Sequence, residues 1–253
     1  MKTDLPRDKT AFLLKFIKPE YEDDFIQGKL YMNTLKYFID LERESRVRGK
    51  GDALEASAVF TDVELTFKDP ETGEVLLKGR AGRTNFHLNE RIQSPVLCMY
   101  SVDKDVLRIV SEDENFINTI PQIDEVDLDT LLSDFGDNML IIDPNEFANR
   151  VIKRCREINL SYRMGKVNYH DFNINYSNRV EKYFDLDSSD ICFVKNNFFK
   201  KQNEFRILLG DIYTKEPYIL DIGDISDIVT KFKISDFFSG GFEISFNKSN
   251  LGI

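Results

Sequence analysis

The stretch that decides the fold reads Lys200-Lys201-Gln202-Asn203-Glu204-Phe205-Arg206-Ile207-Leu208-Leu209. Side chains two positions apart in an extended strand point to the same face. We therefore expect Gln202, Glu204 and Arg206 to line one side of a strand that continues into an apolar segment. An amide, a carboxylate and a guanidinium gathered on one face indicate a surface that meets either water or a ligand.

Outward from this strand, the hydrophobic pattern predicts many short strands and few helices. Apolar or alternating segments predict strands at 11–17, 30–32, 59–67, 74–77, 83–88, 96–102, 140–142, 165–169, 191–194, 218–222 and 242–246. Helices are expected at 20–26, 35–41 and 144–158. Because strands outnumber helices and do not alternate with them, the sequence predicts one α+β domain over residues 1–253. It has mostly antiparallel sheet and three or four helices.

Composition restricts the class of protein. Asp and Glu number 44 against 34 Lys and Arg, so the net charge of -10 disfavours nonspecific binding to nucleic acid or to anionic membranes. No apolar leader segment and no apolar run of membrane-spanning length occurs in the sequence. Cys98, Cys155 and Cys192 are far apart, which is typical of reduced thiols. We expect a cytoplasmic protein with no membrane association.

Several kinds of chemistry lack their motifs. The sequence contains no Gly-x-Gly-x-x-Gly, no Gly-Lys-Ser/Thr, no Gly-x-Ser-x-Gly and no His-Glu-x-x-His. With two histidines and scattered cysteines, no metal site is expected. The Asp-rich segment 221–227 lacks the Glu that a calcium loop carries at its twelfth position, where Phe232 stands, and is interpreted as a turn.

One candidate for ligand binding is the loop Arg46-Val47-Arg48-Gly49-Lys50-Gly51-Asp52-Ala53-Leu54-Glu55. Glycines allow the backbone to approach an anion, and the side chains of Arg46 and Arg48 can pair with phosphate. The alternative interpretation is a solvated basic loop.

A second candidate is the Gln-x-Glu arrangement at 202–204, which is that of mono-ADP-ribosyltransferases. In that chemistry a carboxylate stabilises the oxocarbenium-like ribose as nicotinamide leaves NAD, so Glu204 would be catalytic. Gln202 would position the acceptor, and Phe199 and Arg206 would join Arg46 and Arg48 in holding the cofactor. Alternatively, Arg206 and Glu204 form a plain surface ion pair.

The chain also resembles a group of uncharacterised bacterial and phage proteins, the DUF2971-type proteins. The resemblance is carried by residues 25–38, 48–55, 96–100 and 199–206, with a Gly-x-Leu segment, an acidic residue after a basic loop and a late Glu-x-Arg strand. It implies a distant similarity to the ADP-ribosyltransferase fold, with NAD as the cofactor.

Two functions are therefore expected. The first is an ADP-ribosyltransferase-like protein of bacterial or phage origin that transfers ADP-ribose from NAD to a macromolecule. The second is a non-enzymatic, acidic interaction protein, such as a conflict or anti-defence factor, that binds and blocks a protein partner. In either case a protein partner is expected and nucleic acid is not.

Overall fold

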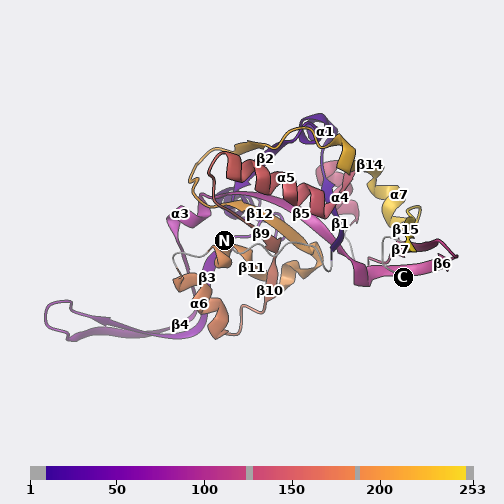
Figure 1. The fold of residues 1–253 in the computed structure, drawn as a ribbon. Helices are drawn as coiled ribbons and strands as arrows, with labels where there is room; N and C mark the ends of the chain where they lie inside the picture. Colours follow the sequence, from indigo (N-terminus) through magenta and orange to yellow (C-terminus); the bar gives the residue numbers. More distant parts are fainter. Residues whose placement is uncertain (1–9, 124–127, 186–188, 249–253) are drawn as a thin grey trace.

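The computed structural model describes residues 10–123, 128–185 and 189–248, and its centre is an eight-stranded sheet (Figure 1). Its strands run in the order β13-β2-β5-β1-β8-β14, while β12 pairs with β5 and β9 pairs with β12. Every pairing in it is antiparallel. The strands are β1 (Thr10–Phe16), β2 (Lys29–Thr34), β5 (Pro95–Asp103), β8 (Asn138–Ile142), β9 (Tyr162–Lys166), β12 (Glu204–Leu209), β13 (Tyr218–Asp221) and β14 (Val229–Lys233).

Three smaller sheets complete the strand content. A three-stranded sheet contains β6 (Leu107–Glu112), β7 (Phe116–Pro121) and β15 (Ile244–Asn247), and a parallel pair contains β10 (Asn168–His170) and β11 (Val194–Asn196). The last sheet is the hairpin of β3 (Ser57–Lys68) and β4 (Val75–His87).

Helices cover both faces of the large sheet. They are α1 (Pro19–Ile26), α2 (Leu35–Ser45), α3 (Asn89–Ile92), α4 (Leu128–Phe135), α5 (Pro144–Glu157), α6 (Ser177–Phe184), α7 (Ile234–Phe238) and the short 3-10 helices η2 (Lys104–Val106), η3 (Asp190–Phe193), η4 (Asn197–Gln202) and η5 (Ser226–Ile228). Helices α1 and α5 share one core with the sheet. Against the opposite face, α2, α6 and η3 form a second core, and α7 packs in a third.

The longest helix shows how the sequence fixes these layers. Asp143 caps α5 by accepting hydrogen bonds from the backbone N–H groups of Asn145 and Glu146, and proline occupies the first turn. Phe147, Val151 and Cys155 follow at intervals of four, so they lie on one helix face. All three are buried against the sheet.

Strand β12 lies between β5 and β9, and all six of its residues are buried. Phe205, Ile207 and Leu209 belong to the core beneath α5, and Leu208 belongs to the core on the other face. The alternation predicted from the sequence is therefore present. It places Glu204 and Arg206 on the face opposite α5.

The α+β class and the mostly antiparallel sheet are confirmed. The described residues form seven α-helices, more than the three or four expected. Two of them, α3 and α7, are only four and five residues long. The predicted strands 74–77 and 83–88 are the two ends of one strand, β4. Most of 191–194 is the 3-10 helix η3. No helix in the described part of the chain is long and apolar enough to cross a bilayer.

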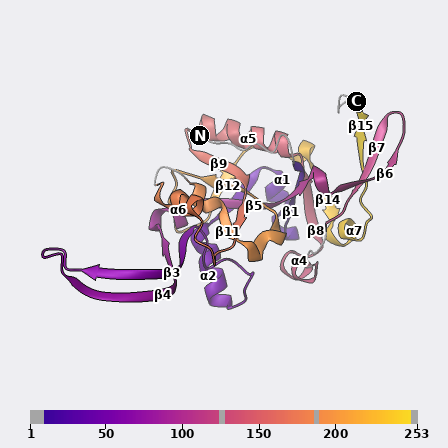
Figure 2. The ribbon, with the colours of Figure 1, turned by 90° about the horizontal axis from the view of Figure 1, so that it is seen from below.

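The hairpin of β3 and β4 projects from the body as a two-stranded arm (Figures 1 and 2). We call residues 57–87 the arm and residues 62–82 its outer half. The division falls at Thr61, which exchanges hydrogen bonds of 2.9 and 2.7 Å with the Asn175 side chain and donates one of 2.8 Å to the Phe172 carbonyl. The next residue, Asp62, has a left-handed φ of 53°. No hydrogen bond between described residues joins the outer half to the body.

Candidate functional site

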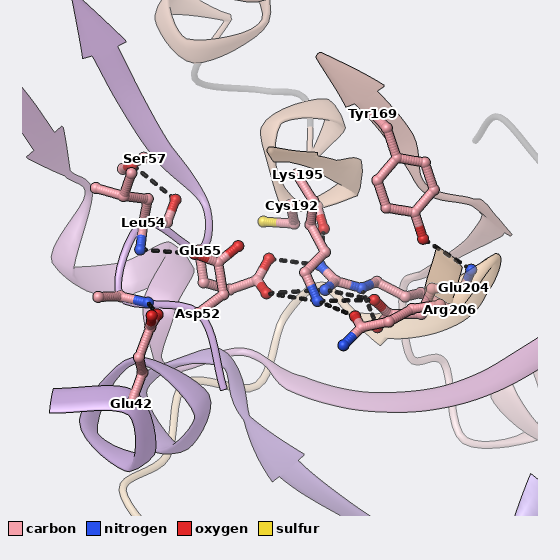
Figure 3. Close-up of polar contacts among 12 residues, drawn as sticks. Glu42, Asp52, Leu54, Glu55, Ser57, Tyr169, Cys192, Lys195, Glu204 and Arg206 are labelled. Carbon is pink, nitrogen blue, oxygen red and sulfur yellow. Dashed lines mark hydrogen bonds and ion pairs between the residues drawn. The ribbon is translucent and has the colours of Figure 1, made fainter. Parts of the chain in front are cut away.

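Five charged side chains from three separate segments meet between the sheet and the base of the arm (Figure 3). Asp52 and Glu55 come from the turns that precede β3, Lys195 from β11, and Glu204 and Arg206 from β12. We call these five residues the charged cluster. Each is between 1% and 6% exposed. Side chains of this kind are rarely buried unless they are paired, so their partners determine what the cluster does.

Arg206 is the centre of the charged cluster. Its Nη1 and Nη2 atoms donate to the two carboxylate oxygens of Glu55 at 2.6 and 2.8 Å, and its Nε atom donates to Glu204 Oε1 at 2.8 Å. Nη1 also donates to the carbonyl oxygen of Cys192 at 2.5 Å. A guanidinium holds a carboxylate best through two parallel bonds of this kind. Arg206 therefore fastens the segment before β3 to the central sheet.

Lys195 closes the cluster on the other side. Its Nζ atom donates to Glu204 Oε2 at 3.0 Å and to Gln202 Oε1 at 2.9 Å, and lies 3.9 Å from Glu55 Oε2. The same ammonium lies 4.6 Å from the centre of the Phe199 ring. Both carboxylate oxygens of Glu204 are thus occupied by cations.

The pKa shifts keep these groups ionised. Burial by itself raises the pKa of Glu204, but the charges of Arg206 and Lys195 outweigh burial and hold this pKa well below its usual range. Burial lowers the pKa of Lys195 and Arg206, yet the adjacent carboxylates outweigh it and raise both. A carboxylate in this state is a fixed negative charge and is unsuited to take up a proton at neutral pH.

Asp52 is the exception in the charged cluster. Burial, followed by the charge of Glu55, raises its pKa to about 7. Its Oδ1 atom accepts a hydrogen bond from the backbone of Leu54, whereas its Oδ2 atom is buried without a hydrogen-bond partner. When Asp52 is protonated, the remaining two carboxylates balance Lys195 and Arg206. When Asp52 ionises, the cluster carries one uncompensated negative charge.

The structure corrects the sequence-based picture of this face. Glu204 and Arg206 share a face, as expected, but that face is buried: the two residues are 6% and 1% exposed. Gln202 is not part of the strand, because it ends helix η4 and Asn203 adopts a left-handed φ of 35° before β12 begins. Its side chain is joined to Glu204 by Lys195, which donates to both. The expected surface ion pair between Glu204 and Arg206 is a buried one.

The predicted phosphate-binding residues lie outside the cluster. Arg46 is exposed and ends α2 in a left-handed conformation. The exposed Arg48 guanidinium lies over the Phe198 ring, 4.0 Å from its centre, so the basic loop does reach the aromatic turn before β12. Phe199 is 4% exposed and packs beneath Lys195. Of the predicted cofactor residues, Arg206 therefore contacts Glu204 directly, and Phe199 contacts Lys195 of the charged cluster.

Three members of the charged cluster, Lys195, Asp52 and Glu55, were not predicted as site residues from the sequence. Lys195 follows an apolar segment and has no charged neighbour in the sequence, so nothing in its immediate context indicates a buried ammonium. Glu55 could have been found from the sequence, because it lies in residues 48–55, one of the segments that carry the family resemblance. Glu204 and Arg206 lie in another of these segments.

Two cavities in the described part of the chain are lined by residues outside the charged cluster. One, of about 630 Å³, lies between α5 and the Asp-rich turn, and its charged lining includes Arg150, Lys153 and Asp224. The other, of about 360 Å³, lies beside β14 and has a mostly apolar lining. Within the described ranges, no group of three or more His, Cys, Asp and Glu residues is arranged to hold a metal ion.

The charged cluster lies at the base of the arm. Glu55 is two positions before the first residue of β3, and Ser57 binds back to the carbonyl of Leu54 through both its backbone N–H and its hydroxyl. Helix α2 supports the same turn, since Glu42 accepts a hydrogen bond of 2.5 Å from the backbone of Ala53. The cluster therefore fixes the direction in which the arm leaves the body.

Comparison with known proteins gives no relative. No family model, no curated protein and no solved structure matches the chain.

Proposed function

We propose that this chain is a non-enzymatic protein-binding module and that the arm is its binding element. The observation that carries the proposal is the exposure of large apolar side chains on the outer half of the arm. Phe67, Leu76 and Leu77 are 53%, 65% and 59% exposed there. A concentration of exposed apolar residues on a projecting element is typical of a surface that another protein covers.

The stability of the arm supports the same proposal. A two-stranded hairpin without a third strand or a packed face is marginally stable in water. The outer half has no hydrogen bond to the body within the described chain, and both of its strands have a free edge. A partner that adds a strand or covers the apolar side chains would supply the missing stabilisation.

The charge of the outer half favours a protein over a nucleic acid as the partner. Residues 62–82 contain five acidic and three basic residues, which are Asp62, Glu64, Asp69, Glu71, Glu74, Lys68, Lys78 and Arg80. Binding to a phosphate backbone requires an excess of cations. The arm has the opposite balance.

The ADP-ribosyltransferase hypothesis has weaker support. Gln202 and Glu204 do approach one another, joined by Lys195. A carboxylate that stabilises a sugar cation must reach the substrate, however, and Glu204 is 6% exposed with both oxygens bound to cations. The geometry of the charged cluster therefore supports anchoring of the arm better than it supports catalysis.

The test is photo-crosslinking from the arm in the cells that make the protein. A photoreactive residue in place of Leu76 is compared with one in place of Ile219, which is similarly exposed on β13. The protein crosslinked from position 76 is then purified, and its binding to the intact chain is measured by calorimetry.

The control is a chain without the outer half. Thr61 pairs with Arg83, so replacing residues 62–82 by Asn-Gly leaves a two-residue hairpin on the intact base of the arm. We expect this chain to fold and to lose at least about 100-fold in affinity for the crosslinked protein. Unchanged affinity, or crosslinks no more specific from position 76 than from position 219, would refute the proposal.

A further inference from the structure

The free edge of β3 is self-complementary. Charged and apolar residues alternate along the outer part of this strand, which reads Glu64-Leu65-Thr66-Phe67-Lys68. When two such strands run antiparallel about a two-fold axis at Thr66, Glu64 of each copy lies opposite Lys68 of the other. In the same register Leu65 lies opposite Phe67. Opposite charges and apolar pairs are the combinations that stabilise neighbouring strands.

We propose that the partner of the arm is a second copy of this chain, and that two β3 strands pair in this register to form a four-stranded intermolecular sheet. The inference rests on the proposed function, because it names the protein that the arm binds. A two-fold axis makes the contact isologous and closed, so the product is a dimer.

Contacts within each arm extend the match across the four strands. On one face, Leu65 already pairs with Gly79 and Phe67 with Leu77 in each copy. The new rows therefore run Leu77, Phe67, Leu65, Gly79, with large residues beside a small one. On the other face, Arg80 donates to Glu64 at 2.7 Å, so Glu64 of each copy would lie between two cations.

The other free edge of the arm does not have this property. The charged residues of β4 are the cations Lys78, Arg80 and Arg83, so two β4 strands would bring like charges together. Leu76 is also an extra residue in β4, because Phe67 pairs with Leu77 while Lys68 pairs with Val75. Such a bulge interrupts the regular edge that a new strand requires. The regular edge of the outer half belongs to β3.

The conformation of Asp62 sets the length of the pairing. Its left-handed φ of 53° interrupts the extended backbone of β3. Pairing about Thr66 uses only residues on the tip side of this interruption. A register centred on Leu65 would instead require Asp62 to pair with Lys68, which the interruption disfavours.

The test is sedimentation of the full chain over a dilution series, with charge reversals in β3. Glu64→Lys or Lys68→Glu alone places like charges opposite one another twice in each dimer, and we expect the dissociation constant to rise about tenfold or more. In an equimolar mixture, a dimer with one copy of each variant again has opposite charges facing one another at both places. We expect the mixture to dimerise with close to the wild-type dissociation constant.

Glu71→Lys is the matched control, because it makes the same charge change in the turn beyond the strand. It should leave dimerisation unchanged. Circular dichroism of each variant shows whether the body remains folded. The inference is overturned if the wild-type chain stays monomeric at about 100 times its concentration in the cell. It is also overturned if the mixture of the two variants does not recover dimerisation.

Cysteine crosslinking tests the register independently. Thr66→Cys places a thiol opposite itself on the two-fold axis, so mild oxidation should give a disulfide-linked dimer in high yield. Thr72→Cys, which is also exposed but lies in the turn, should give little. If the chain is monomeric and yet a different protein binds the arm, this inference fails while the proposed function stands. If truncating the arm alters neither self-association nor binding of any crosslinked protein, both fail.

Discussion

Glu55 and Arg206 lie 151 positions apart in the chain and are joined by two parallel hydrogen bonds of 2.6 and 2.8 Å. This pair fastens the base of the arm to the middle strand of three, β5, β12 and β9. It is also buried, with side-chain exposures of 2% for Arg206 and 1% for Glu55. Removing one partner of a buried ion pair strongly lowers the free energy of unfolding, because the other charge is left buried without compensation.

Replacing Glu55 by Gln should therefore destabilise the protein strongly. The variant keeps the shape of the side chain but leaves Arg206 with one carboxylate in place of two, and we expect the free energy of unfolding to fall by roughly 3–5 kcal/mol. Urea denaturation followed by circular dichroism measures the change. Glu157→Gln is the control, since it removes the exposed pair with Arg154 and should change stability by less than about 1 kcal/mol. Equal effects of the two substitutions would contradict the anchoring role.

Asp52 should make stability fall as the pH rises from about 4 to 7. Its pKa is about 7 in the folded protein and 3.8 in the reference state, so the folded chain holds a proton that the unfolded chain has lost in this window. Ionising Asp52 in the folded state thus costs about 4 kcal/mol, reached in full above pH 7. Asp52→Asn removes this term. We expect the Asp52→Asn variant to have a higher free energy of unfolding than wild type at pH 8 and a similar one at pH 4.

At low pH, the protonation of Glu204 has the opposite effect on stability: stability falls as the pH falls. The pKa of Glu204 is lowered in the folded state, so its contribution to stability is present above its ordinary pKa of 4.5 and is lost as the pH falls below that value. Both wild type and Asp52→Asn should lose stability there. The free energy of unfolding of each protein is measured by urea denaturation across this pH range. If the values for wild type and Asp52→Asn run parallel between pH 4 and 8, Asp52 is ionised throughout and the prediction fails.

Purified protein is expected neither to bind NAD nor to release nicotinamide from it. Calorimetry measures binding, and chromatography measures nicotinamide in the presence and absence of candidate acceptor proteins. A positive result that disappears in a folded Glu204→Gln variant, and weakens in Arg48→Ala, would instead establish the ADP-ribosyltransferase hypothesis. Because Glu204 is part of the charged cluster, thermal unfolding of that variant must accompany the assay.

Gly28 should not tolerate a side chain. It has a φ of 84°, and a Cβ atom there would overlap the carbonyl oxygen of Gly223. Gly73 has a similar φ of 74° in the turn of the arm, with nothing near the position of a Cβ atom. Gly73→Ala should therefore cost only the backbone strain, about 1 kcal/mol, while Gly28→Ala should cost several times more. Chemical denaturation of both variants separates strain from overlap.

Local patterns predicted much of the fold. The run 144–158 follows a capping Asp143, has a proline in its first turn and carries apolar residues every four positions, so helix α5 was predictable nearly to its ends. Strands were predicted at 59–67 and 74–77, and residues 68–73 between them contain the Pro and Gly of a hairpin turn. What the pattern left open was that β4 continues through 78–82. Gly79, Arg80 and Gly82 interrupt the hydrophobic alternation there because that part of the arm has no core to face.

The candidate site was predictable only in part, for a different reason. Strand periodicity does place Glu204 and Arg206 on one face. Their burial depends on Glu55 and Lys195, which reach them from other segments, and no local pattern reports a contact of that kind. Gln202 was misplaced because Asn203 adopts a left-handed conformation, which shifts the start of the strand.

The long separation between Glu55 and Arg206 also bears on how the protein is made. During synthesis, the segment with β3 and β4 leaves the ribosome well before β12 does. Until Arg206 emerges, Glu55 lacks its guanidinium partner and the base of the arm is without its anchor. Contacts this distant in sequence also slow folding, because a long loop must close first. A nascent chain stalled before residue 206 should therefore display an unanchored hairpin with its apolar side chains exposed, a form that chaperones bind.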